Sequence, residues 1–278
     1  MKFGRMFLAA TMVLILTAAM AGSAFAAALS GKVTVAGSTS VAPYMEALAK
    51  MFMAKNPQVK ITVESIGSGQ GIVAAMEGTA DIGMSSRELK DEEKSLKEFE
   101  LCIDGLAIIV SQSNTVKGLT KAQAKDIFMG KITDWKAVGG TAGKINLYTR
   151  EASSGTRGAF EELVLGKDAK GAQITIDEEI YAAVMNSTGQ LAQAVVGDRN
   201  AIGYVSLGIV SSYKVNALAI DGVAATMENL SKGTYKISRP FLLITKGEAK
   251  EPAKSFLDYC LNSQEAKDYL ISKAFVIR

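Results

Sequence analysis

A short apolar strand, a loop of small residues and an amphipathic helix follow one another repeatedly from Lys32 onward. Alternating or continuous apolar runs indicate the strands, and apolar residues three or four positions apart indicate the helices. The predicted elements of this first series are residues 32–36, 41–55, 59–66, 70–77 and 80–84. Strands that alternate with helices in this way form the sheets of α/β proteins. The sequence therefore predicts an α/β fold.

A second series of elements begins after a continuous apolar strand at residues 104–111. The elements predicted around and beyond it are helices at 91–100, 158–165, 191–196 and 251–259, and strands at 145–149, 201–205 and 241–245. The terminal part is too short to stand alone, so we expect it to rejoin the first unit. The predicted division is one lobe from residues 27–110 with 236–278, and a second lobe from residues 111–235.

The first 26 residues have the features of a secretory signal peptide. Lys2 and Arg5 precede an apolar run of about 16 residues, from Met6 to Ala21, and Ala24-Phe25-Ala26 fits a cleavage site. The alternative is an N-terminal membrane anchor, but a spanning helix needs about 20 apolar residues. No cysteine follows the run as a site for lipid attachment. We therefore expect cleavage after Ala26 and a soluble periplasmic protein.

The chain contains no histidine and only two cysteines. Without histidine, Ser-His-Asp and Cys-His catalytic arrangements and most zinc sites are excluded, and we expect no metal site. The formal charge is +3, and removal of Lys2 and Arg5 leaves +1, which gives no indication of nucleic-acid binding. Cys102 and Cys260 either pair in an oxidising compartment or lie in the core, and their apolar surroundings favour the core.

Four strand ends run into small loops that are rich in hydroxyl groups. The loops are Gly37-Ser38-Thr39-Ser40, Gly67-Ser68-Gly69, Ser85-Ser86-Arg87 and Ser153-Ser154-Gly155-Thr156-Arg157. Helix N-termini offer free N–H groups, glycine lets the backbone approach a ligand, and hydroxyl groups donate further hydrogen bonds. In any one loop, a helix cap is the simpler explanation. Four such loops at the carboxyl ends of strands together favour a site for a dehydrated oxyanion.

Arg150 comes directly before the longest of these loops. Its planar guanidinium can donate two parallel hydrogen bonds to an oxyanion, at roughly 1.5–3 kcal/mol for each charged hydrogen bond. We therefore assign Arg150 as the principal charge of the site. Arg87 and Arg157 either assist it or pair on the surface with nearby glutamates, which are Glu88, Glu161 and Glu162.

Motifs of other functional classes do not fit. Residues 67–72 lack the glycine spacing of a dinucleotide-binding loop, and no loop has the Gly-Lys-Ser/Thr ending of a nucleotide-binding loop. Residues 211–214 match the S-x-x-K pattern of some serine acyl-transfer enzymes, but the companion motifs are missing. Trp135 is interpreted as a packing residue. These patterns argue against nucleotide binding and give little support to catalysis.

Several segments resemble the periplasmic phosphate-binding proteins of ABC transporters, within the type II periplasmic binding protein class. The matching segments begin with the loops at 36–40, 66–69 and 81–87, and continue at 104–107, 127–135, 150–156 and 233–240. The loop from Arg150 to Thr156 and the segment from Phe128 to Trp135 are the most specific. The resemblance covers nearly the whole chain after the predicted signal peptide.

The resemblance implies two α/β lobes with a cleft between them, joined by two hinge strands and closing on phosphate. The implied phosphate contacts are Thr39, Ser40, Ser68, Ser86, Arg150, Ser154, Gly155 and Thr156, with Ser38 and Arg87 as further candidates. It also implies a monomeric receptor that uses no cofactor, catalyses no reaction, and delivers inorganic phosphate to a membrane-embedded ABC permease.

One position departs from the family pattern. Many members have an aspartate that accepts the proton of phosphate, and this chain has Ser86 there. Another tetrahedral oxyanion, such as sulfate, therefore stays open as the ligand. The alternatives outside this class are an exported serine hydrolase and a sensor or adhesin that has kept the fold.

Overall fold

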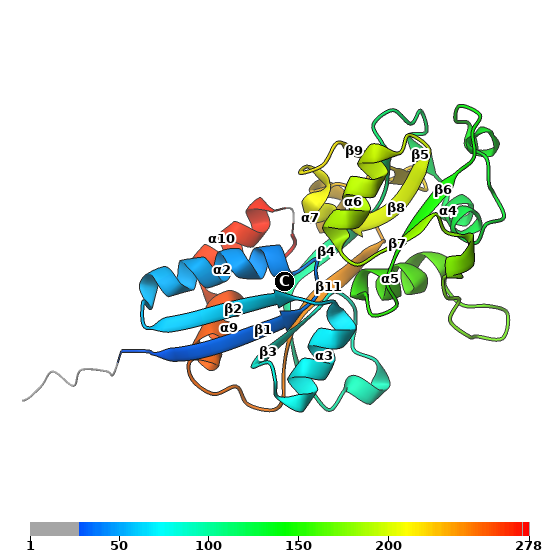
Figure 1. The fold of residues 1–278 in the computed structure, drawn as a ribbon. Coiled ribbons are helices and arrows are strands. Elements are labelled where there is room, and N and C mark those ends of the chain that lie inside the picture. The colour runs from blue at the N-terminus through cyan, green and yellow to red at the C-terminus, as the bar shows by residue number, and fades with distance from the viewer. Residues whose placement is uncertain (1–27, 274, 278) are drawn as a thin grey trace, which may run out of the picture.

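The computed structural model describes residues 28–273 and 275–277, so the predicted signal peptide lies outside the described residues. Figure 1 shows two α/β lobes joined by β4 (Lys97–Ser111) and β11 (Ser238–Thr245), which run from one lobe into the other. The predicted α/β fold with two lobes and two hinge strands is confirmed.

A nine-stranded sheet runs through both lobes in the described part of the chain. Its order is β2 (Val59–Ser65), β1 (Gly31–Gly37), β3 (Ile82–Ser85), β11, β4, β8 (Ala201–Ser206), β6 (Asn146–Arg150) and β7 (Ala183–Met185), and β9 (Val215–Ala217) also pairs with β4. The short strands β5 (Gly118–Leu119) and β10 (Ala219–Ile220) form a separate pair. Because β4 and β11 lie in the middle of this order, the two lobes share one continuous sheet.

Helices cover both faces of the sheet in the first lobe. They are α2 (Ala42–Lys55), α3 (Ser68–Glu77), α9 (Ala253–Asn262) and α10 (Gln264–Ser272). Side chains along β11 alternate between the two faces: Leu243 packs with Phe256 of α9, whereas Leu242 and Ile244 pack with Ile72 of α3. The sheet of the first lobe is therefore buried on both sides at its centre, whereas one face of its edge strand β2 is exposed.

The second lobe repeats this arrangement with helices α4 (Lys121–Phe128), α5 (Gly155–Phe160), α6 (Thr188–Gly197), α7 (Leu207–Val210) and α8 (Met227–Ser231). Ile108 of β4 packs with Trp135 and Phe160 on one face, and Ile109 packs with Leu191 of α6 on the other. Short 3₁₀ turns lie at Trp135–Val138 and Glu178–Ile180, and a π-helical turn at Glu161–Leu165 follows α5. A further 3₁₀ turn, at Asp91–Glu93, lies in the first lobe before β4. Trp135 is 1% exposed, so its predicted packing role is confirmed.

The predicted helix at residues 91–100 is wrong. Only Asp91–Glu93 form a 3₁₀ turn, and β4 begins at Lys97. The side chains around Phe99 alternate between packed and exposed: Phe99 packs against the apolar core of the first lobe, and its neighbours Glu98 and Glu100 are exposed. This alternation has the period of a strand, and pairing with β11 fixes it.

The predicted strand at 104–111 is the second half of β4, and its side chains already belong to the second lobe's core at Leu106, Ile108 and Val110. The exact division of the chain at residues 110 and 235 stays a prediction. Cys102 and Cys260 are unpaired and buried in the apolar core of the first lobe, which confirms their interpretation as core residues. No helix in the described residues is both long and apolar enough to cross a bilayer.

Candidate oxyanion site

The carboxyl ends of the parallel strands of both lobes face one another at the hinge (Figure 1). In the first lobe β2, β1 and β3 are parallel, and in the second lobe β6 is parallel to both β7 and β8. Loops that follow such strands lie at one edge of a sheet, where ligands of α/β proteins bind. The hydroxyl-rich loops predicted from the sequence are therefore brought together from the two lobes.

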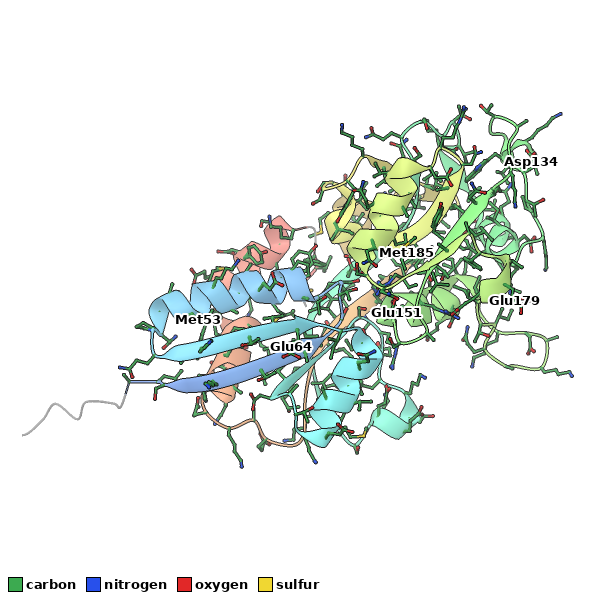
Figure 2. All side chains as sticks on the ribbon, in the orientation of Figure 1. Met53, Glu64, Asp134, Glu151, Glu179 and Met185 are labelled. Carbon is green, nitrogen blue, oxygen red and sulfur yellow. The ribbon has the colours of Figure 1, made fainter. Side chains whose placement is uncertain are left out.

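The Arg150 side chain, at the end of β6, is 1% exposed. Its Nε and Nη2 atoms donate to the two carboxylate oxygens of Glu151 at 2.9 Å each, and Nε also donates to the Met185 backbone oxygen at 3.1 Å. Figure 2 shows Glu151 and Met185 where the two lobes meet. These bonds hold the guanidinium in one orientation, and the carboxylate partly offsets the desolvation of its charge.

A cluster of four hydroxyl groups surrounds the other edge of this guanidinium. Arg150 Nη1 donates to Thr188 Oγ1 at 2.8 Å, and Nη2 donates to Thr39 Oγ1 at 3.1 Å. Ser40 Oγ lies 2.8 Å from Thr188 Oγ1 and 2.9 Å from Thr156 Oγ1. The cluster combines one loop of the first lobe with the N-terminal ends of α5 and α6 in the second, so it exists only where the lobes meet.

Ser68, Ser86 and Gly155 form a second group beside the first. Ser68 Oγ accepts a hydrogen bond from the Ser86 backbone N–H at 3.1 Å and lies 3.3 Å from Ser86 Oγ. A Cβ atom at Gly155 would lie 2.2 Å from Ser68 Oγ and 2.8 Å from Ser86 Oγ. Only glycine permits this approach of the α5 N-terminus to the first lobe. A helix N-terminus places N–H groups and a partial positive charge beside the hydroxyl groups.

Ser38 and Ser154 are buried in the same region, and their oxygens accept hydrogen bonds from the backbone, Ser38 in the turn before α2 and Ser154 as the N-cap of α5. Ser38 Oγ accepts from the backbone N–H groups of Ser40 and Val41 at 3.2 and 3.3 Å. Ser154 Oγ accepts from the Arg157 N–H at 3.3 Å. These bonds use the acceptor side of each hydroxyl, so each proton stays available to donate to a ligand.

Arg87 lies outside the cluster around Arg150. It donates to both carboxylate oxygens of Glu93, at 2.7 and 2.8 Å, and its side-chain partner is therefore a glutamate of its own lobe. Its stem packs over the second lobe, because a Cβ at Gly158 would lie 3.1 Å from Arg87 Cδ. The closed arrangement of the lobes thus includes a contact by the stem of Arg87, while its charge is compensated locally.

Arg157 is buried and holds structure around the site. It pairs with Glu161 at 2.9 Å and with Glu178, and it donates to the backbone oxygen of Arg150 at 3.0 Å. Of the glutamates considered from the sequence, Glu161 is its partner. Its guanidinium therefore supports the backbone that carries Arg150.

Thr188 is the member of the hydroxyl cluster that the sequence analysis missed. It is 2% exposed and is the first residue of α6, which Ser187 caps. The preceding strand β7 has only three residues, and it was not recognised. The signal was the sequence Ser187-Thr188-Gly189 before a helix, which has the same small, hydroxyl-rich character as the four loops that were recognised.

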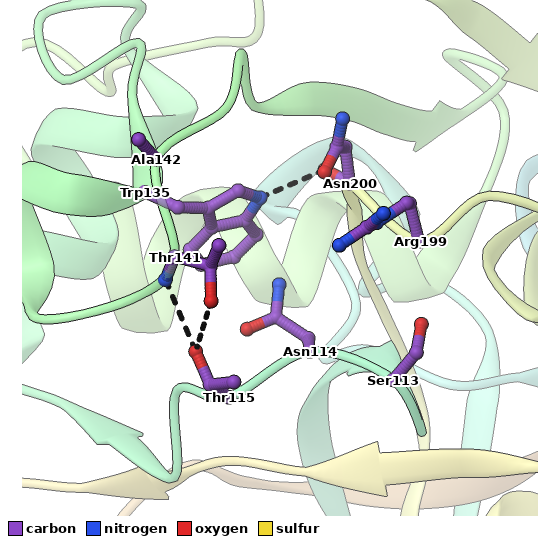
Figure 3. A pocket seen from close by; sticks show the side chains of 8 residues that line it. All are labelled: Ser113, Asn114, Thr115, Trp135, Thr141, Ala142, Arg199 and Asn200. Atoms are coloured by element: carbon purple, nitrogen blue, oxygen red, sulfur yellow. Dashed lines mark hydrogen bonds between the residues drawn. The ribbon is translucent and has the colours of Figure 1, made fainter.

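Several cavities lie outside the cluster, and two of them include an arginine in their lining. A cavity of about 750 Å³ opens beside it between the lobes, and its lining includes Gly69 and Arg87 from the first lobe and Ser154 and Gly158 from the second. A smaller cavity of about 170 Å³ in the second lobe is shown in Figure 3, with Arg199 as the charged side chain in its lining. Within residues 28–273 and 275–277, no group of three or more acidic, cysteine or histidine side chains is arranged to hold a metal ion.

Comparison with known proteins agrees with this geometry. Residues 22–265 match the family model of the PBP superfamily domain. The phosphate-binding protein PstS of Bacillus subtilis (strain 168) is 34% identical over 251 residues, which cover 89% of this chain and 81% of PstS.

Two crystal structures are also similar. A Clostridium perfringens protein with bound phosphate has a TM-score of 0.81 and 43% identity, over 89% of this chain and 100% of that one. An ABC-type phosphate transport receptor from Vibrio cholerae has a TM-score of 0.71 and 36% identity, over 88% of this chain and 100% of that one. The fold, the family model and these relatives agree, and the chain belongs to the PBP superfamily and, within it, to the family of phosphate-binding proteins of ABC transporters.

Proposed function

We propose that this protein is an exported receptor that captures inorganic phosphate between its lobes and delivers it to an ABC-type permease. The observation that carries the proposal is the buried guanidinium of Arg150, surrounded by hydroxyl groups from both lobes. A dehydrated tetrahedral anion needs many donors that converge from several directions, and this arrangement supplies them. The names of the relatives support phosphate as the anion.

The proposed phosphate contacts are those that the resemblance implied. Arg150 supplies the positive charge, and Gly155 offers its backbone N–H at the start of α5. The hydroxyl contacts are Thr39, Ser40, Ser68, Ser86, Ser154 and Thr156. All of these side chains are at least nine-tenths buried, so an anion held there exchanges its hydration shell for protein donors.

Sulfate is the second candidate, and Ser86 is the observation that favours it. No aspartate stands at this position to repel an anion without a proton. Glu151, the carboxylate nearest to Arg150 in sequence, has both oxygens bonded to that arginine. Its charge therefore balances Arg150 and leaves proton recognition to a neutral hydroxyl.

A receptor is preferred over a serine hydrolase because the chain has no histidine to activate a serine. The serines of the cluster hydrogen-bond to hydroxyl groups, backbone N–H groups and each other. Purified protein is expected to bind phosphate without turning over a phosphate ester or an acyl ester.

Export and association with a permease are part of the proposal. Mass spectrometry of the exported protein should give a mass that begins near Ala27, and the protein should be a soluble monomer without detergent. An intact Met1 in the exported protein would contradict cleavage of the signal peptide.

Calorimetry of the mature protein with phosphate, sulfate and arsenate tests the central claim. We expect tight binding of phosphate and arsenate at one site per chain, and weaker binding of sulfate. Arg150→Ala should abolish the heat of binding, whereas Lys246→Ala, an exposed charge of the first lobe, should leave it unchanged. Loss of binding in both variants would contradict the proposal. So would the absence of any heat of phosphate binding in the native protein.

A further inference from the structure

We infer that Thr188 relays the charge of Arg150 to Ser40 and Thr156, and thereby fixes these hydroxyl groups as donors to the bound anion. This inference rests on the proposed function, because it concerns how the same site recognises its ligand. It assigns a role to a residue outside the set implied by the family resemblance.

Thr39 Oγ1 already accepts two hydrogen bonds. One comes from the Thr188 backbone N–H at 3.2 Å and the other from Arg150 Nη2 at 3.1 Å. A hydroxyl oxygen has two lone pairs and one proton. Thr39 can therefore accept nothing more, and its own proton can only be donated, to Thr188 Oγ1 at 3.1 Å or to a ligand.

The direction of the next bond follows from this saturation. Thr188 Oγ1 accepts from Arg150 Nη1 at 2.8 Å, so its proton must be donated to another atom. Thr39 cannot accept it. Ser40 Oγ, at 2.8 Å, is the remaining partner among the described residues, and Thr188 therefore donates to Ser40.

Ser40 continues the chain of hydrogen bonds toward Thr156. Its oxygen accepts from Thr188, and its proton is free for Thr156 Oγ1 at 2.9 Å or for the anion. The chain starts at a fixed positive charge, passes from the second lobe to the first at Ser40, and returns at Thr156. Each bond in such a chain polarises the next and strengthens it by about 10–30%.

The consequence is a site whose Arg150 side contains donors only. The phosphate dianion, which can turn its unprotonated oxygens toward Arg150 and its one remaining proton toward Ser86, is matched better than the monoanion, which carries two protons. Thr188 is thus a positioning and specificity-determining residue: it orients the hydroxyls of the other lobe. Its burial, at 2% exposure, keeps water from competing for these bonds.

The test compares Thr188→Val, which keeps the shape but removes the hydroxyl, with Thr188→Ser, which keeps the hydroxyl. Thr62→Val, on an exposed position of β2, is the matched control. We expect phosphate affinity to fall by about 10- to 100-fold in Thr188→Val, as for the loss of a charged hydrogen bond. Thr188→Ser should stay within about threefold of the native protein, since it restores that bond, and Thr62→Val should be unchanged.

A pH series separates this role from a merely structural one. Native affinity should rise with pH as phosphate loses its second proton, and the affinity of Thr188→Val should rise less steeply. Native-like affinity in Thr188→Val, equal losses in the valine and serine variants, or parallel pH profiles would each overturn the inference. If the native protein binds no phosphate, the proposed function itself fails, and the inference fails with it.

Discussion

Asp104 and Arg239 face each other across the two hinge strands, and Asp104 Oδ2 accepts hydrogen bonds from Arg239 Nε at 3.1 Å and Nη2 at 3.0 Å. Both side chains are almost fully buried. Arg239 Nη1 also donates to the backbone oxygen of Ser86 at 3.1 Å, and Ser206 Oγ donates to Asp104 Oδ1 at 2.8 Å. The pair therefore links the hinge to a loop of the oxyanion site.

Removal of one member of this pair should destabilise the protein much more than removal of both. Asp104→Leu leaves the guanidinium of Arg239 buried without a counter-ion, and we expect a loss of about 3–5 kcal/mol in the free energy of unfolding. The double variant Asp104→Leu with Arg239→Met should lose far less, because an apolar pair of similar volume often replaces a buried ion pair without loss. Urea unfolding monitored by circular dichroism measures both, and equal losses would contradict the prediction.

The same pair should make stability depend on pH. Burial raises the pKa of Asp104 to about 6, against the opposing attraction of Arg239. Because the folded-state pKa lies above the unfolded value of about 3.9, the folded protein holds the proton more tightly. The contribution of Asp104 to stability is therefore largest at or below about pH 4 and is lost as the pH rises through about 6.

Asp104→Asn removes this titration and serves as the reference. Between pH 4 and pH 7 the native protein should lose stability relative to Asp104→Asn, as measured by urea unfolding at each pH. Curves that run parallel over this range would show that Asp104 has no such shift.

Arg150 and Arg157 should affect different properties. Arg150→Lys keeps a positive charge but cannot form the fork that reaches Thr39 and Thr188, so phosphate affinity should fall by about 10- to 100-fold. Arg157→Ala should mainly lower the free energy of unfolding, because it leaves Glu161 and the backbone oxygen of Arg150 without their buried donor. Calorimetry and urea unfolding on the same preparations separate the two effects. Equal losses of affinity in the two variants would refute this assignment.

Ser86→Asp should raise the ratio of phosphate affinity to sulfate affinity. Ser68 Oγ already accepts from the Ser86 N–H, so its proton is more readily donated, whereas Ser86 Oγ receives no N–H bond from the described residues. Ser86 is thus able to accept the proton of phosphate, but it carries no charge to repel sulfate. Competition binding should detect some sulfate binding to the native protein. An unchanged or lower ratio in Ser86→Asp would sink the idea.

The elements that form the site were largely predictable from the sequence because short strands, small residues and helices follow one another at regular spacing. The sequence predicts Arg150, Thr39, Ser40 and Thr156 as contacts of an anion, and the structure brings them into one hydrogen-bonded cluster. Loops at the carboxyl ends of parallel strands converge whatever their exact lengths, and this convergence needs no knowledge of side-chain positions.

The contacts that depend on strand pairing could not be predicted in this way. The ion pair between Asp104 and Arg239 follows from the register of β4 against β11, and these residues are far apart in the sequence. Thr188 was missed because the strand before it is too short to show a period. The start of β4 at Lys97 could not be predicted because its charged, exposed residues resemble the solvated face of a helix. Pairing with β11 makes this segment a strand.

The strand β4 also limits how the protein can be taken apart. Its first half pairs with β11 and its second half pairs with β8, so one uninterrupted strand is an interior member of the sheet in both lobes. A fragment that ends within β4 would expose unpaired backbone on whichever side lost its half. Exchange of lobes between relatives, or complementation of split fragments, would therefore require junctions in the loops outside β4 and β11, with both strands inherited from the same parent.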